Sequence, residues 1–123
     1  MTLPRPIGAI ARFAQIIGPE AAFRLAEAHG GTRVYVPHKA AGSDLAKIIG
    51  DDAAALMTTE WQGVQVKIPV AREWRCVTYR SRGDTYDDIA LRLGCDISTV
   101  HKILRAQQMT HVQLDFFPAD LRP

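Results

Sequence analysis

The chain has 123 residues, of which 47% are hydrophobic and 23% are charged, and its formal net charge is +2. This length allows one compact domain or two very small ones and excludes a large enzyme scaffold, and the composition excludes wholesale disorder. No apolar run approaches the ~20 residues needed to cross a bilayer. The N-terminus lacks the uninterrupted apolar core of a secretory signal, so we expect a cytoplasmic protein.

The first half of the chain contains an internal repeat. Residues 16–37 and 48–69 align without a gap at an offset of 32, and eight of the 22 paired positions are identical. Each copy predicts a helix of about three turns, followed by glycine where a left-handed conformation is needed. Pro19 suits the first helical position in one copy, and Asp51 can cap the free amides in the other.

Two further helices are expected upstream of the copies, one over residues 7–17 and one over 45–49 that Ser43 or Asp44 can cap. A short strand ends each copy, at residues 32–36 and 64–68, and a proline stops it. We therefore expect two helix-helix-strand units related by a pseudo-twofold axis. Their strands are expected to pair as a ribbon that lies on the helices or joins a partner's ribbon.

Alternation along these strands predicts one apolar face, formed by valines and an isoleucine including Val64, and one polar face. The polar face is either a solvated surface or a surface that contacts phosphates beside DNA. Its members are Arg33, Tyr35, Gln65 and Lys67.

The second half predicts three helices without strand-like alternation. The first spans residues 71–81 with Trp74, Val77 and possibly Cys76 inside. Thr85 caps the second helix, and Gly94 ends it in a tight turn where positive φ is tolerated. A buried Cys95 is expected next, then a third helix capped by Asp96 or Ser98. The residues expected to pack the second and third helices together are Ile89, Ala90, Leu93, Val100, Ile103 and Leu104.

This pattern is typical of a helix-turn-helix, whose third helix lies in the major groove of DNA. The residues predicted to contact bases are Ser98, Thr99, His101 and Lys102. Those predicted to contact phosphates are Arg80, Arg82, Thr85 and Arg105. Asp84, Asp87 and Asp88 suit the dipole at the start of the second helix but face phosphates poorly, which weakens the electrostatic argument.

Residues 26–37 (AEAHGGTRVYVP), their second copy and residues 87–105 (DDIALRLGCDISTVHKILR) resemble the Mor/C family of phage transcription activators. The resemblance implies a homodimer, formed through the N-terminal domain, that binds a dyad-symmetric site and helps to recruit bacterial RNA polymerase. It places the recognition helix at residues 96–105. The chain departs from the family pattern because it has two Gly-Gly-strand-Pro elements, and the one next to the helix-turn-helix has Gln62-Gly63 in place of Gly-Gly.

Other classes of function are less well supported by the residues. The chain has four histidines and two cysteines, Cys76 and Cys95, but no HExxH, CxxC, nucleophile elbow or phosphate loop, so we expect no enzyme, cofactor or metal site. A helix-turn-helix repressor, or a protein-interaction module of a mobile element, remains the alternative because nothing in the residues separates activator from repressor.

The sequence thus predicts a mainly α-helical protein with a short two-stranded β-ribbon, in two small modules. Residues 1–70 form the duplicated module, 71–106 the helix-turn-helix, and 107–123 an apolar tail that packs on the chain or on a second subunit. The expected partners are double-stranded DNA, a second copy of the chain and RNA polymerase, with no membrane.

Overall fold

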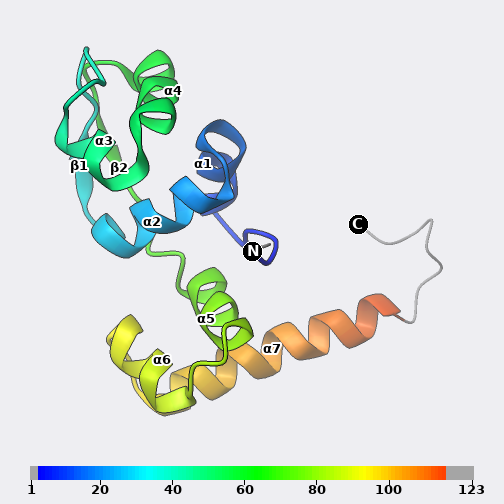
Figure 1. The fold of residues 1–123 in the computed structure, drawn as a ribbon. Coiled ribbons are helices and arrows are strands. Elements are labelled where there is room, and N and C mark those ends of the chain that lie inside the picture. The colour runs from blue at the N-terminus through cyan, green and yellow to red at the C-terminus, as the bar shows by residue number, and fades with distance from the viewer. Residues whose placement is uncertain (1–2, 116–123) are drawn as a thin grey trace. The chain divides into compact units, whose positions relative to one another are not determined.

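The computed structural model describes residues 3–115, with side chains up to Gln107, and it is mainly helical with one small sheet (Figure 1). The first four helices and two strands are α1 (Ile10–Ile17), α2 (Pro19–His29), β1 (Arg33–Tyr35), α3 (Asp44–Ile49), α4 (Asp51–Trp61) and β2 (Gln65–Lys67). Three helices follow: α5 (Arg72–Ser81), α6 (Tyr86–Leu93) and α7 (Ile97–Asp115). Contacts divide the chain into two compact units after Trp74.

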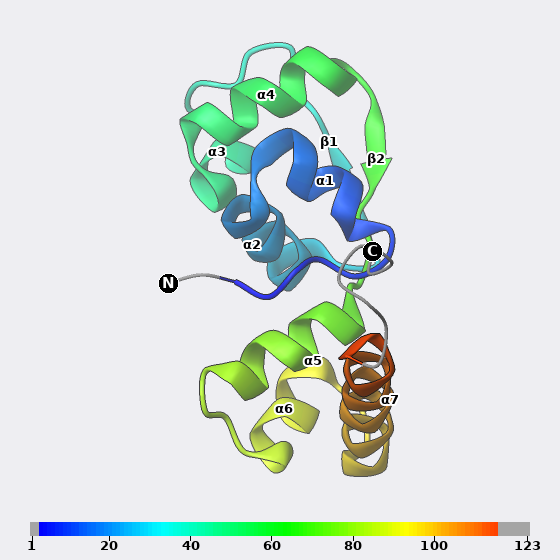
Figure 2. The same cartoon turned by 90° about the vertical axis from the view of Figure 1, so that its right-hand side faces the viewer.

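In the N-terminal unit the order helix-helix-strand occurs twice, and β1 and β2 form an antiparallel ribbon beside helices α1–α4 (Figure 2). The predicted mainly helical fold with a short two-stranded ribbon is therefore confirmed. Positions 32 residues apart also share backbone conformation. Gly18 has φ 90° and ψ 154° before α2, and Gly50 has φ 92° and ψ 159° before α4.

Hydrogen bonds at the ribbon ends repeat with the same offset. The amide of Gly31 donates to the carbonyl of Ile68 at 2.7 Å, and the amide of Gly63 donates to the carbonyl of Val36 at 2.9 Å. Gly31 and Gly63 both have positive φ, of 86° and 75°, as a left-handed turn requires. A shallow depression between the starts of α2 and α4 follows the same pattern, because residues 17–21 and 24 line it together with residues 49–53 and 56.

The core of this unit contains both members of each equivalent pair of apolar positions. These buried pairs are Phe13 and Leu45, Ala14 and Ala46, Ile17 and Ile49, Ala21 and Ala53, Ala22 and Ala54, Leu25 and Met57, and Val36 and Ile68. The unit also holds the first turn of α5, where the fully buried Trp74 donates from Nε1 to the carbonyl of Pro4 at 2.9 Å. The ring of Trp74 meets Phe23 edge-on at 5.4 Å.

Local sequence signals explain most helix ends. Pro19 stands at the first position of α2, and the hydroxyl of Ser43 accepts from the amide of Ala46 at 3.1 Å as the cap of α3. Asp51 does not cap α4 as expected, since Gly50 is the cap residue and no side chain accepts a hydrogen bond there. Val64 is 52% exposed rather than buried, because β2 begins only at Gln65.

In the C-terminal unit the three expected helices are present, with three differences in detail. Thr78 and Tyr79 are buried on α5 whereas Val77 is only half-buried, because the buried face of the helix is centred on Cys76 and Tyr79. Cys95, Ile103 and Leu104 are half-buried rather than buried. Helix α7 continues to Asp115, into the segment expected to be a separate tail. Its side chains from Met109 onward, and residues Phe116 and Phe117, lie outside the described residues.

No helix in the described part of the chain is both long and apolar enough to cross a membrane.

Candidate nucleic-acid interface

Helices α6 and α7 are joined by only three residues, beginning with Gly94, which adopts the left-handed conformation at φ 66° and ψ 38°. Its amide closes α6 onto the carbonyls of Ala90 and Leu91. Ile89 and Val100 are fully buried in the unit, one on each helix. The short connection and these buried residues hold the two helices against each other.

The start of α6 is capped as the sequence predicts. The hydroxyl of Thr85 accepts from the amide of Asp88 at 3.1 Å, and Thr85 itself has extended backbone. Thr85 is exposed, so its backbone and the first turn of α6 are accessible to solvent. A phosphate contact by Thr85 requires the hydroxyl to donate while it accepts this cap bond, which the chemistry of a hydroxyl allows.

The exposed side of α7 carries four of the five candidate residues of the third helix. Ser98, His101, Lys102 and Arg105 are all exposed, and their spacing places them on one stripe of the helix. Thr99 lies beside this stripe and is half-buried. The structure therefore brings together two hydrogen-bonding side chains near the N-terminal end of α7 and two cations one turn further on.

Three elements of this unit meet around Tyr86. The guanidinium of Arg80 lies 4.9 Å from the ring centroid of Tyr86, and the ring of His101 meets Tyr86 edge-on at 4.5 Å. Arg80 also donates to the carbonyl of Asp84 at 3.0 Å. A candidate phosphate contact on α5 is thus linked to a candidate base contact on α7 through one aromatic ring.

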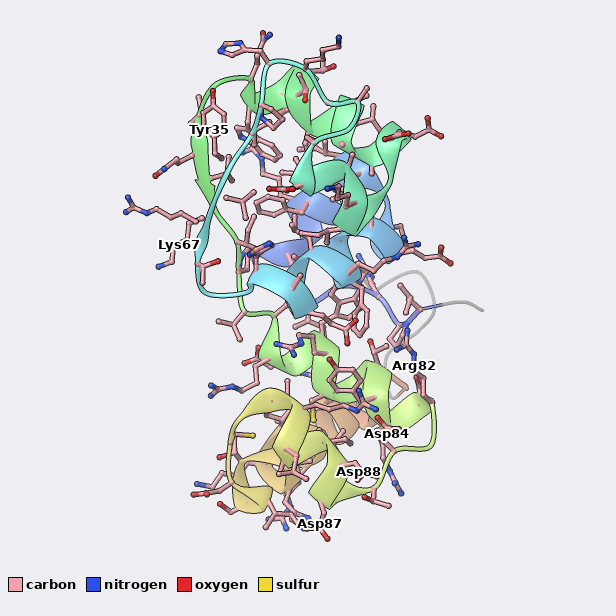
Figure 3. The ribbon with its side chains drawn as sticks, turned by 60° about the vertical axis from the view of Figure 1, so that its left-hand side comes forward. Tyr35, Lys67, Arg82, Asp84, Asp87 and Asp88 are labelled. Atoms are coloured by element: carbon pink, nitrogen blue, oxygen red, sulfur yellow. The ribbon has the colours of Figure 1, made fainter. Side chains whose placement is uncertain are left out.

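The carboxylates near the start of α6 differ in their partners (Figure 3). Asp84 accepts an ion pair from Nε of Arg92 at 3.1 Å, so that carboxylate is balanced within the unit. Asp87 and Asp88 are exposed in the first turn of α6, where they stabilise the helix dipole. Arg82, an exposed candidate phosphate contact, precedes Asp84 in the same loop.

Two residues that support this surface were not identified from the sequence. Arg75 is 9% exposed, and it donates to the hydroxyl of Tyr79 at 3.3 Å and to the carbonyl of Arg92 at 3.4 Å. A spacing of four residues on one helix is a signal that could have paired Arg75 with Tyr79. The contact between Tyr86 and His101 has no such local signal, because the two residues belong to different helices.

The four candidate residues of the strands share the outer face of the ribbon. Arg33 lies directly opposite Lys67 and Tyr35 lies opposite Gln65, and all four are exposed. Figure 3 shows Tyr35 and Lys67 extending outward from the ribbon. Like charges at directly opposed positions destabilise a sheet, so the Arg33–Lys67 pair has a cost that an anion bound between the cations would remove.

Metal binding has no support in the part of the chain that the structure describes, where no three His, Cys, Asp or Glu side chains gather. Cys76 is buried and Cys95 half-buried, and both are free thiols. Comparison of the chain with known protein families, with curated protein sequences and with solved structures gives no significant match in any of the three.

Proposed function

We propose that the chain is a sequence-specific double-stranded DNA-binding transcription regulator, in which α6 and α7 act as a helix-turn-helix. The observation that carries the proposal is the tight α6–α7 connection at Gly94 together with the exposed stripe on α7. In this arrangement α7 enters the major groove and presents its N-terminal residues to base edges.

The roles of the α7 side chains follow from their chemistry and order. His101 and Lys102 donate to guanine N7 or O6, and Ser98 and Thr99 contact bases or phosphate near the start of the helix. Arg105 lies one turn further on and meets the backbone. Arg80, Arg82 and Thr85 hold the phosphates, while Arg92 neutralises Asp84 at 3.1 Å and so removes one repulsive charge.

The ribbon supplies a second basic surface in this proposal. Arg33 and Lys67 contact phosphates, and the unfavourable pairing of these two cations in the free protein supports an anionic partner. The repeated elements, core pairs and hydrogen bonds of the N-terminal unit support its origin as two copies of one helix-helix-strand module.

The resemblance to the Mor/C activators extends the proposal to a homodimer on a dyad-symmetric operator near a phage or prophage promoter. Its two α7 helices are expected ~34 Å apart in successive major grooves. Truncation at Gln108 tests the tail as a subunit contact, and a lower mass by light scattering is expected. Loss of transcription when the protein is added to a reporter would defeat the activator assignment.

A protein-interaction role is the second candidate because of two exposed apolar side chains. Leu91 is 82% exposed on α6 and Ile97 is 42% exposed at the start of α7. An apolar surface of this kind suits a protein partner better than a phosphate backbone.

The first experiment measures the anisotropy of a labelled duplex against salt concentration, for the wild type and for Lys102→Ala/Arg105→Ala. Each phosphate contact releases counterions, so log K should fall by about 0.9 per contact for each unit of log salt. We expect the double variant to bind more weakly and with a shallower slope. Arg24→Ala/Lys47→Ala removes the same charge from α2 and α3 and should leave both quantities unchanged. Absence of binding by the wild type at low salt would overturn the proposal.

A further inference from the structure

The two halves of the N-terminal unit differ at one cavity. An opening of about 400 Å³ lies between the end of α2, β1 and α3. It is lined by apolar side chains that include Val34, Leu45 and Ile48 and by polar ones that include His29, Arg33 and Asp44. This volume is within the range of small-molecule sites.

The corresponding position in the other half, 32 residues away along the chain, contains an aromatic ring. Trp61 stands there in place of His29, and its ring centroid lies 5.1 Å from that of Phe13, which stands in place of Leu45. The guanidinium of Arg12 lies 6.0 Å from the ring of Trp61, and Arg12 stands in place of Asp44. The protein thus shows, in its own second half, that a fused aromatic ring packs at this place in the fold.

The replacements on the His29 side all reduce the aromatic volume. An imidazole takes the place of an indole, and a leucine takes the place of a phenylalanine. His29 is half-buried at the end of α2 and Leu45 is 4% exposed, so an apolar wall is retained while the ring that would cover it is absent from the chain.

The charges at the cavity favour an anion. Arg33 lines the cavity and lies directly opposite Lys67 across the ribbon, so a carboxylate at Arg33 would relieve the repulsion between these two cations. The carboxylate of Asp44 is already compensated in part, because the ammonium of Lys47 lies 3.7 Å from it.

We propose that this cavity is a binding site for a small aromatic carboxylate. The ring takes the place that the indole of Trp61 takes in the other half, and the carboxylate binds Arg33. The site is separate from the residues that carry the DNA-binding proposal on α7, and its test uses no DNA.

The experiment follows backbone amide chemical shifts of the full chain during titration with indole-3-acetate. We expect shifts centred on His29, Val34 and Leu45. His29→Trp fills the cavity with the side chain that the other half already accommodates, and it should weaken binding at least tenfold. Ala28→Trp adds the same ring at the neighbouring exposed position of α2, outside the cavity lining, and should bind like the wild type.

Two further arms test the ring and the charge separately. Tryptamine has the same ring with a cation, and binding as tight as that of indole-3-acetate would overturn the assignment of an acid. Absence of shifts at these residues with millimolar indole-3-acetate would overturn the site. Equal binding by the wild type and by folded His29→Trp would overturn it as well.

Discussion

Val34 pairs with Val66 across the ribbon, and these two residues are also equivalent positions of the sequence repeat, 32 residues apart. In an antiparallel pair related by a twofold axis, the residue on the axis must face its own equivalent. The observed register therefore places a pseudo-twofold axis between Val34 and Val66. Residues on either side of this pair face the neighbour of their equivalent, which is why Arg33 lies opposite Lys67 and not opposite Gln65.

This register makes a charge reversal at Lys67 informative. In Lys67→Glu, a carboxylate replaces the ammonium opposite Arg33, so a repulsive pair becomes an attractive one. We expect the free energy of unfolding to rise by about 0.2–1 kcal/mol in urea denaturation. DNA affinity should fall, because one phosphate contact is lost and a negative charge is added to the ribbon face.

The matched control is Gln65→Glu, which adds a carboxylate to the same strand face opposite Tyr35. This variant should weaken DNA binding as well, but it has no directly opposed cation to stabilise it. Equal stability of Lys67→Glu and Gln65→Glu would contradict the cross-strand repulsion. Unchanged DNA affinity in both variants would restrict the ribbon face to a solvated surface.

Equivalent core positions should respond alike to truncation. Leu25 on α2 and Met57 on α4 are both fully buried, so Leu25→Ala and Met57→Ala should each cost about 2–5 kcal/mol of unfolding free energy. The control is Leu56→Ala, whose side chain is 49% exposed next to Met57 and should cost far less. Denaturant titration measures all three. A small loss in only one of the two buried variants would show that the halves do not share the core equally.

Much of this fold can be predicted from the sequence because its signals are local. Pro19, Ser43, Thr85 and Gly94 fix helix ends through their own backbone and side-chain chemistry, and the offset of 32 identifies the two strands. Where a neighbour in sequence supplies the chemistry, the predicted and observed positions agree.

The rest depends on contacts between segments distant in sequence. Burial of Arg75 depends on the carbonyl of Arg92, and the setting of His101 depends on Tyr86 in another helix. The exposure of Val64 depends on where the ribbon begins, which the hydrogen bond from Gly63 to Val36 determines. Neither alternation nor helical spacing contains this information.

The turn between α6 and α7 should be sensitive to a side chain at Gly94. No heavy atom lies within 4 Å of a Cβ placed there, so the cost of Gly94→Ala comes from the left-handed backbone alone and should be about 1–2 kcal/mol. Gly94→Asn should cost less, because asparagine tolerates this conformation better than alanine. Thermal and urea unfolding report the order of the variants. A loss in Gly94→Asn as large as in Gly94→Ala would point to a steric cause instead.

The ring of Tyr86 should contribute to DNA binding through the residues it holds. In Tyr86→Leu the ring contacts to Arg80 and His101 are lost, and each such contact is worth about 0.5–1 kcal/mol, so affinity for duplex DNA should fall about two- to fivefold. Tyr86→Phe keeps the ring and should bind DNA as tightly as the wild type. Anisotropy at fixed salt measures the affinities, and circular dichroism verifies that both variants are folded. Equal weakening in Tyr86→Phe and Tyr86→Leu would assign the effect to the hydroxyl, and full affinity in folded Tyr86→Leu would remove Arg80 and His101 from the interface.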